Sequence, residues 1–133
     1  MVKKRSTLKH NDFVLFAARI LLSGIFLMAA FGQLRDPVGT KAYMASAGMF
    51  GIDFLYICAV LFLIAGGLSV LLGYRTDIGA VLLMLFLIPT TLIFHIDFSD
   101  MNQIIQLQKN LAILGGLFAI YVAGPGKISV DKK

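Results

Sequence analysis

The residues of this sequence that are best suited to chemistry lie toward one end of its apolar segments. His95 follows a long apolar run, Lys109 and Asn110 open another, and Gln33 and Thr91 fall near the same predicted end. Histidine and lysine donate hydrogen bonds to carbonyl or anionic oxygens, and amides and hydroxyls add further donors and acceptors. Together they predict a binding site for a quinone headgroup or a sulfur oxyanion. The alternative is that His95 bonds only to lipid headgroups or loop backbone and that Lys109 is a surface anchor.

A buried ion pair is the second feature that the spacing suggests. Arg19 and Gln33 share one face of a predicted helix, and Asp77, Ile88 and Thr91 share one face of another. Each helix separates its two polar positions by 14 residues, from Arg19 to Gln33 and from Asp77 to Thr91. If the helices are parallel neighbours, Arg19 reaches Asp77 at one end and Gln33 meets Thr91 at the other. Two simpler interpretations stay open: Arg19 extends to lipid phosphates, and Asp77 only caps a helix.

Metal, haem and thiol chemistry find little support in the sequence. The two histidines, His10 and His95, are predicted at opposite ends of the apolar segments, so they cannot ligate one haem iron. His95, Asp97 and Asp100 follow no strong metal-ligand spacing. The single cysteine, Cys58, can neither close an intrachain disulfide nor run a thiol relay. We therefore predict no metal and no covalent cofactor.

Four long apolar segments must position these residues. The chain is 59% hydrophobic and 14% charged, against roughly 45–50% and about 25% in soluble domains. Segments of about 20 residues match the ~30 Å hydrocarbon layer of a bilayer, where only helices and closed barrels satisfy the backbone. The pattern predicts an all-α, four-helix transmembrane bundle and excludes an ordinary soluble enzyme. The predicted helices cover residues 13–34, 54–73, 78–96 and 108–123.

The distribution of charge predicts how the bundle is oriented. Eight Lys and Arg residues lie in the two tails and in the turn near residue 75, against three in the other connections. The positive-inside rule then predicts that both termini are cytoplasmic, in a multi-pass protein of the cell inner membrane. The predicted domains are a basic tail over residues 1–12, a membrane domain over 13–126 and a second basic tail over 127–133. The net charge of +5 indicates contact with anionic lipid rather than nucleic acid.

The connections and the glycines complete the predicted fold. Residues 41–50 predict a short interfacial helix on the outer side, ended by Gly51. The pairs Gly66-Gly67 and Gly115-Gly116 predict close helix packing, with an internal duplication as a weaker hypothesis. The predicted result is a tight bundle whose outer side is covered by connecting segments.

Several short motifs resemble those of a known family. One apolar segment carries Arg19-Ile20-Leu21-Leu22-Ser23-Gly24, and another ends in Phe94-His95. The last segment begins Lys109-Asn110-Leu111-Ala112 and is followed by Gly124-Pro125-Gly126. In order and spacing these motifs resemble the DoxX family of small bacterial and archaeal membrane proteins. The resemblance implies four membrane helices and a link to membrane redox work, since relatives belong to a thiosulfate:quinone oxidoreductase or to a complex that handles oxidative and sulfur stress.

The sequence also departs from the usual pattern of that family. Many relatives have a lysine near the position of Gln33 and a glutamate shortly before the glycine pair of the second helix. Here residues 59–65 are apolar, and the chain contains no glutamate. A catalytic or proton-handling role of that pair is therefore not transferred to this chain.

Two functions follow from these patterns. The first is a subunit or accessory protein of a quinone-linked membrane redox system that handles sulfur or thiosulfate, with quinone as a noncovalent cofactor and a redox subunit as partner. The second is a non-catalytic lipid-binding or structural membrane protein that stabilises a partner complex. Any enzymatic role is at most that of an oxidoreductase subunit, and both functions are compatible with a homo-oligomer. A proton-coupled exporter is disfavoured because no Asp lies clearly at the predicted bilayer midplane.

Overall fold

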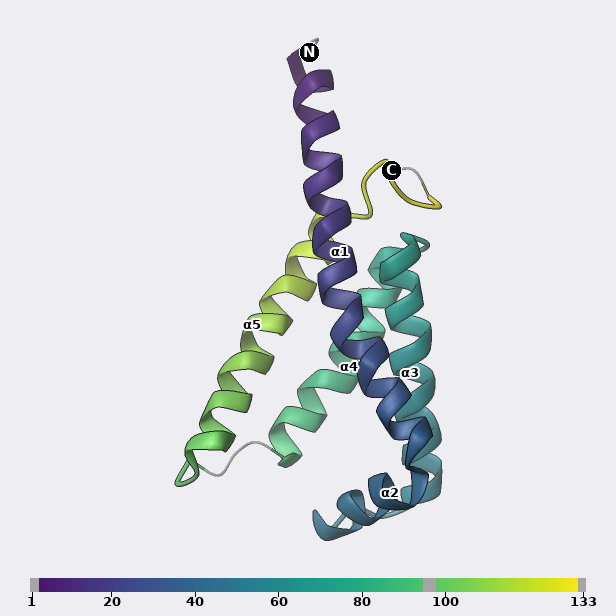
Figure 1. The fold of residues 1–133 in the computed structure, drawn as a ribbon, viewed down its shortest axis with the longest axis vertical. Coiled ribbons are helices and arrows are strands. Elements are labelled where there is room, and N and C mark those ends of the chain that lie inside the picture. Colours follow the sequence, from purple (N-terminus) through teal and green to yellow (C-terminus); the bar gives the residue numbers. More distant parts are fainter. Residues whose placement is uncertain (1–2, 95–97, 132–133) are drawn as a thin grey trace.

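The computed structural model describes residues 3–94 and 98–131, with side chains from residue 10 onward. In that part of the chain there are five helices (Figure 1), which are α1 (Lys3–Arg35), α2 (Pro37–Ser46), α3 (Ile52–Leu72), α4 (Thr76–Phe94) and α5 (Met101–Ala123). Four of them are long and apolar enough to cross a membrane: α1 from residue 10 onward, and α3, α4 and α5 over their full length. The all-α architecture with four candidate spans agrees with the prediction, and α2 is the additional short helix.

The long helices form a bundle, and α2 lies across one end of it (Figure 1). Helix α3 packs against both α1 and α4, whereas α5 packs mainly against α4. The N-terminal half of α1, the α3–α4 turn and the C-terminal segment lie at what we call the terminal end, where the start of α1 projects beyond the other two, and α2 marks the opposite, α2 end. The buried core between the long helices consists of Phe26, Ala30, Leu63, Val70, Ala80, Leu83, Leu87 and Leu117.

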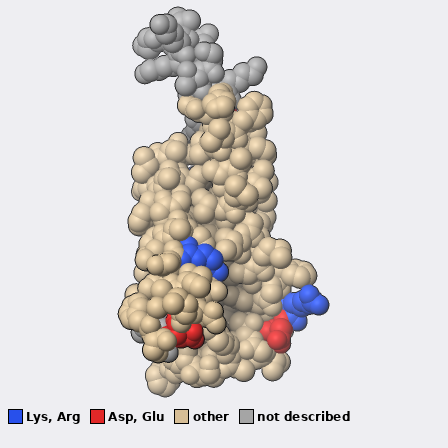
Figure 2. Space-filling view, turned by 60° about the vertical axis from the view of Figure 1, so that its left-hand side comes forward, with Lys and Arg blue, Asp and Glu red and all other residues tan. Residues whose placement is uncertain are grey.

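The outer surface of the bundle is apolar over most of its length. Large side chains such as Leu21 and Val122 point outward and are 77% and 84% exposed. On the face shown in Figure 2, the described charged side chains lie toward the α2 end, and a long uncharged surface extends beyond them. Soluble proteins rarely expose so large an apolar surface. This surface is therefore suited to contact with lipid.

Capping residues explain why two helices begin earlier than the sequence predicted. Helix α2 begins at Pro37 and not at residue 41, because the Asp36 carboxylate accepts a backbone hydrogen bond at 3.0 Å and proline suits the first helical turn. Helix α5 begins at Met101 and not at residue 108, because the Asp100 carboxylate accepts one at 2.9 Å. Periodicity of apolar residues locates the buried part of a helix, whereas the cap determines where the helix starts.

Glycines allow two of the helices, α3 and α4, to pack closely. At Gly66 an added Cβ atom would lie 2.8 Å from the Leu83 side chain and 3.0 Å from the carbonyl oxygen of Gly79. Gly67 faces a leucine of α1 equally closely, whereas Gly115 faces open space. The close packing predicted at Gly66-Gly67 is confirmed, and it joins α3 to α4 on one side and to α1 on the other.

This contact gives α4 a buried face that differs from the predicted one. Thr91 belongs to the buried face, but Asp77 and Ile88 are exposed. The small residues Gly79 and Ala80 allow α4 to approach α3 closely, and they rotate the helix so that Asp77 points outward. The buried residues of α4 are Thr76, Gly79, Ala80, Leu83, Leu87 and Thr91.

We expect Gly66→Val to lower the free energy of unfolding by about 1–3 kcal/mol, because the added atoms overpack the α3–α4 contact. The matched control is Gly115→Val, which adds the same atoms where nothing lies within 4 Å and should change stability by less than about 0.5 kcal/mol. Reversible unfolding in mixed detergent micelles measures both. Equal stability of the two variants would show that the contact is not tight.

Candidate functional site

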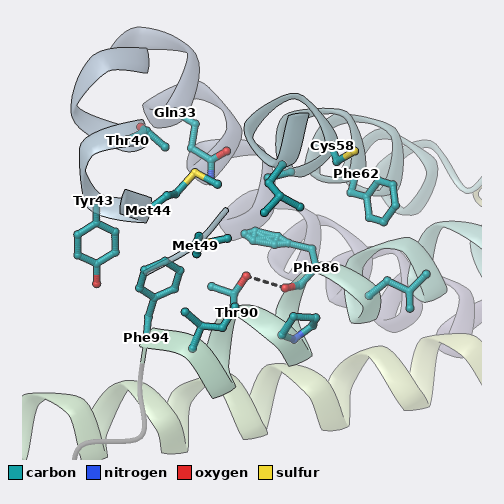
Figure 3. A pocket seen from close by; sticks show the side chains of 15 residues that line it. Gln33, Thr40, Tyr43, Met44, Met49, Cys58, Phe62, Phe86, Thr90 and Phe94 are labelled. Carbon is teal, nitrogen blue, oxygen red and sulfur yellow. Dashed lines mark hydrogen bonds between the residues drawn. The ribbon is translucent and has the colours of Figure 1, made fainter. Parts of the chain in front are cut away.

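A pocket of about 440 Å³ lies at the α2 end, where α2 covers a space between α1, α3 and α4 (Figure 3). Gln33 enters it from α1, and Thr40, Tyr43 and Met44 enter from α2. A volume of this size is typical of small-molecule sites, which range over about 300–1,000 Å³. The remaining lining residues are Met49, Leu55, Cys58, Ala59, Phe62, Leu85, Phe86, Pro89, Thr90, Ile93 and Phe94.

The lining formed by residues 33–94 is almost entirely apolar and carries no charged side chain. The Tyr43 and Phe94 rings stack with centroids 4.7 Å apart, which joins α2 to the end of α4. Phe62 and Phe86 add aromatic surface from α3 and α4 (Figure 3). Such walls offer dispersion contacts to a flat, uncharged ligand.

Few polar groups line this apolar pocket, and only some of them have a hydrogen-bond partner within the described part of the chain. The Thr90 hydroxyl donates to the Phe86 carbonyl oxygen at 2.7 Å, and the Thr40 hydroxyl donates to the Asp36 carbonyl oxygen at 2.8 Å. The Gln33 Oε1 atom is buried and has no hydrogen-bond partner within the described part of the chain. An unpaired buried amide oxygen is unfavourable. The Gln33 amide is therefore the group in this pocket that most needs a ligand.

Contacts between α2 and α3 hold the cover of the pocket in place. The Lys41 ammonium lies 3.0 Å from the Asp53 carboxylate and 5.1 Å from the centroid of the Tyr56 ring. The Tyr56 hydroxyl in turn donates to the backbone carbonyl oxygen of Gln33 at 2.7 Å. Because the Lys41–Asp53 pair is exposed, it contributes at most about 1 kcal/mol. The cover is therefore fixed mainly by packing, whereas the Tyr56 hydrogen bond joins α3 to the end of α1, directly before α2.

The predicted ligand-binding residues do not form one cluster. Asn110 donates through Nδ2 to the Thr91 hydroxyl oxygen at 3.0 Å, and both side chains are buried between α4 and α5. Gln33 instead lines the pocket, and Lys109 is exposed on α5. His95 lies outside the described residues. Only the Thr91–Asn110 pair of the predicted set is brought into direct contact, and it joins two helices away from the pocket.

Arg19 has a different environment from the predicted ion pair. Its side chain is fully buried, and Nη1 donates to the Val70 and Leu71 carbonyl oxygens, both at 3.4 Å. Nη2 donates to the Ile128 carbonyl oxygen, while Asp77 is exposed and is not among the partners of Arg19. The last carbonyls of a helix lack intrahelical donors and carry partial negative charge. These carbonyls are the acceptors of the guanidinium, in place of the Asp77 carboxylate or the lipid phosphates that the sequence suggested.

The C-terminal segment is docked against the bundle by the same cluster of contacts. The Asp12 carboxylate accepts from the Lys127 backbone N–H at 3.2 Å. The Val130 and Asp131 N–H groups donate to the backbone carbonyls of Leu72 and Gly73, at 2.9 and 3.1 Å. Residues 125–131 are therefore an ordered part of the terminal end.

Gly73 has the conformation and the space that this docking requires. Its φ angle is 73°, in the left-handed region that favours glycine, and an added Cβ atom would collide with the Arg19 guanidinium. Sequence reasoning missed this arrangement, although Gly73 and the Gly-Pro-Gly motif at residue 124 were signals of it. Sequence reasoning also missed most of the pocket walls, and the available signal was the aromatic and methionine content of α2 and its flanks.

A known protein family matches the part of the chain that builds the pocket. The DoxX family model matches residues 14–96, which is more than half of the chain. The chain belongs to the DoxX family. The segment that matches DoxX contains every residue that lines the pocket, from Gln33 to Phe94. The predicted family resemblance is confirmed.

Two proteins of Escherichia coli strain K12 are similar in sequence to nearly the whole chain. Inner membrane protein YqjF is 32% identical over 93% of this chain and 94% of its own length. Inner membrane protein YphA is 31% identical over 96% of this chain and 99% of its own length. No solved structure gives a significant match. Together with the four candidate spans, these relatives identify an integral membrane protein of the DoxX family.

Proposed function

We propose that this DoxX-family protein holds a membrane quinone in the pocket at the α2 end and acts as a subunit or accessory protein of a quinone-linked redox system. The observation that carries the proposal is the pocket itself, which is about 440 Å³ in volume, is lined by aromatic rings with no charged side chain among its described lining residues, and contains the Gln33 amide, whose oxygen has no partner in the described part of the chain. Such a lining suits a flat, neutral, lipid-soluble molecule with a polar head. The inner membrane location of YqjF and YphA supports placing this protein in the same membrane.

The donor set agrees with a quinone better than with a sulfur oxyanion. A quinone ring is planar and can stack on the Phe62 or Phe86 ring, and the Gln33 Nε2 group can donate a hydrogen bond to its oxygen. Met44 and Met49 adapt their shape to substituents on the ring. An oxyanion would require charge-assisted hydrogen bonds from Arg, Lys or His, and none of these is among the described residues that line the pocket.

The roles of the protein's own residues follow from this placement. The aromatic side chains bind and orient the quinone ring, and Gln33 hydrogen-bonds to its polar substituent. Helix α2 covers the pocket and excludes water from it. The quinone supplies the redox chemistry when it is bound, and a partner subunit exchanges electrons with it. A sulfur compound, in this proposal, is a substrate of the partner and not a ligand of the pocket. Both termini face the cytoplasm, where the excess of Lys and Arg near the terminal end favours them.

Equilibrium binding to the purified protein in nanodiscs tests this proposal. We expect a short-chain 1,4-naphthoquinone or 1,4-benzoquinone to bind saturably with one site per chain, and thiosulfate not to compete. Tyrosine fluorescence reports the binding, since Tyr43 lines the pocket and the chain has no tryptophan. Absence of saturable quinone binding by folded protein would contradict the proposal. Stoichiometric phospholipid in the pocket would then favour the lipid-binding alternative.

A further inference from the structure

We infer that the pocket prefers a hydroxyl-bearing ring, a hydroquinone or another neutral phenol, over the corresponding carbonyl form. This inference rests on the proposed function, because it specifies which redox form of the ligand the same pocket selects. It follows from a comparison of the hydrogen-bond donors and acceptors that the lining offers. A hydroquinone presents two O–H donors, whereas a quinone presents two carbonyl acceptors.

The two threonine hydroxyls of the pocket can only accept a further hydrogen bond. Each hydroxyl has one proton and two lone pairs. The Thr90 proton is used in the bond to the Phe86 carbonyl, and the Thr40 proton is used in the bond to the Asp36 carbonyl. Their remaining lone pairs can meet a ligand O–H but not a ligand carbonyl.

The Gln33 side-chain oxygen and the Leu85 backbone carbonyl are further hydrogen-bond acceptors. Gln33 Oε1 is buried and has no hydrogen-bond partner among the described residues, and the residue lines the pocket (Figure 3). Pro89 has no N–H, so the carbonyl of Leu85, four residues earlier in α4, lacks its usual helical donor. Both Leu85 and Pro89 line the pocket. An unpaired amide oxygen and a backbone carbonyl that lacks its helical donor both favour a ligand that brings protons.

Donors are weaker in this lining. The Gln33 amide nitrogen can donate, and the Cys58 thiol is a weak donor. The Tyr43 hydroxyl points away from Gln33, toward the outside of the pocket (Figure 3). Among the lining residues that the structure describes there is no Lys, Arg or His to polarise a quinone carbonyl. The balance of acceptors over donors therefore selects the reduced, hydroxyl-bearing form.

The preference has a consequence for the redox potential of the bound couple. Two extra hydroxyl–acceptor pairs should make the hydroquinone bind roughly tenfold more tightly than the quinone. Tenfold tighter binding of the reduced form raises the midpoint potential of a two-electron couple by about 30 mV. The protein would therefore favour acceptance of electrons by its ligand.

Anaerobic competition binding tests the preference with three ligands that share one ring: the naphthohydroquinone, the naphthoquinone and the dimethyl ether of the hydroquinone. We expect the hydroquinone to bind roughly tenfold more tightly than either of the others, since both lack O–H donors. Thr90→Val should reduce this ratio, because it removes a hydroxyl acceptor and keeps the shape, and Thr90→Ser should restore it. Thr91→Val is the control, since Thr91 contacts Asn110 and does not line the pocket.

Each outcome separates this inference from the proposed function. Equal affinity for the quinone and the hydroquinone would overturn the inference and leave quinone binding intact. Tight binding of the dimethyl ether would show that donors on the ligand play no part. If no ring binds to folded protein, the proposed function fails as well. An unchanged ratio in Thr90→Val, with a helical content equal to that of Thr91→Val, would exclude the threonine contribution.

Discussion

Replacement of Arg19 by leucine is expected to release the C-terminal segment from the terminal end. The guanidinium connects the Val70 and Leu71 carbonyls at the end of α3 to the Ile128 carbonyl of that segment. A hydrogen bond to a charged group contributes about 1.5–3 kcal/mol, and the carbonyls left behind lose their donor. Tryptic cleavage after Lys127 should therefore become ~10- to 100-fold faster, as measured by intact-mass spectrometry over time.

Two further variants control for loss of charge and for general damage to α1. Arg35→Leu removes an exposed arginine of the same helix and should leave cleavage after Lys127 unchanged. Arg19→Lys keeps the charge, but an ammonium lacks the planar fork of donors that reaches several carbonyls, so cleavage should be intermediate. If Arg19→Leu protects Lys127 as well as the native protein does, the buried guanidinium does not hold the segment.

The second large effect is expected from Ala59→Trp, which should abolish binding of a ring in the pocket. Ala59 lines the pocket from α3, and an indole at this position would take up much of the roughly 440 Å³ that a ligand needs. Steric exclusion of this kind should weaken quinone affinity by at least about tenfold, equivalent to about 1.4 kcal/mol. Titration of the variant with naphthoquinone in nanodiscs measures the loss.

The matched variant Ala112→Trp places the same side chain on an exposed position of α5. It should bind quinone as the native protein does, and its helical content should equal that of Ala59→Trp. Undiminished binding by Ala59→Trp would move the ligand out of the proposed pocket. Equal losses in both variants would show that an added tryptophan disturbs the bundle wherever it is placed.

The buried face of α1 could be predicted from the sequence, because helical periodicity determines which residues share a face. Arg19, Ser23, Phe26 and Ala30 follow the spacing of one helix face, and all four are buried. Periodicity identifies the residues that turn inward without identifying the helix that lies opposite. The Arg19 contact to Ile128 spans 109 residues of sequence. A hydrogen bond to a backbone carbonyl leaves no mark in side-chain type, and for this reason sequence reasoning considered only Asp77 and lipid phosphates as partners of Arg19.

The pocket was beyond sequence reasoning for a different physical reason. An empty space forms where packed helices diverge, so it depends on crossing geometry and on the placement of α2. Gln33 was correctly singled out as a polar residue near one end of the bundle. The sequence grouped it with Asn110 and Thr91 because all three lie at a similar depth. The structure separates them, because Thr90 and Thr91 point to different sides of α4, one to the pocket and one to α5.

Photo-crosslinking with a diazirine-bearing naphthoquinone tests the central claim most directly. Labelled peptides, identified by mass spectrometry, should come from α2, α3 and α4 and include Tyr43, Phe62 or Phe86. An excess of unlabelled naphthoquinone should suppress this labelling. Labelling spread over the lipid-facing side of α5, or unaffected by competitor, would contradict a quinone pocket at the α2 end.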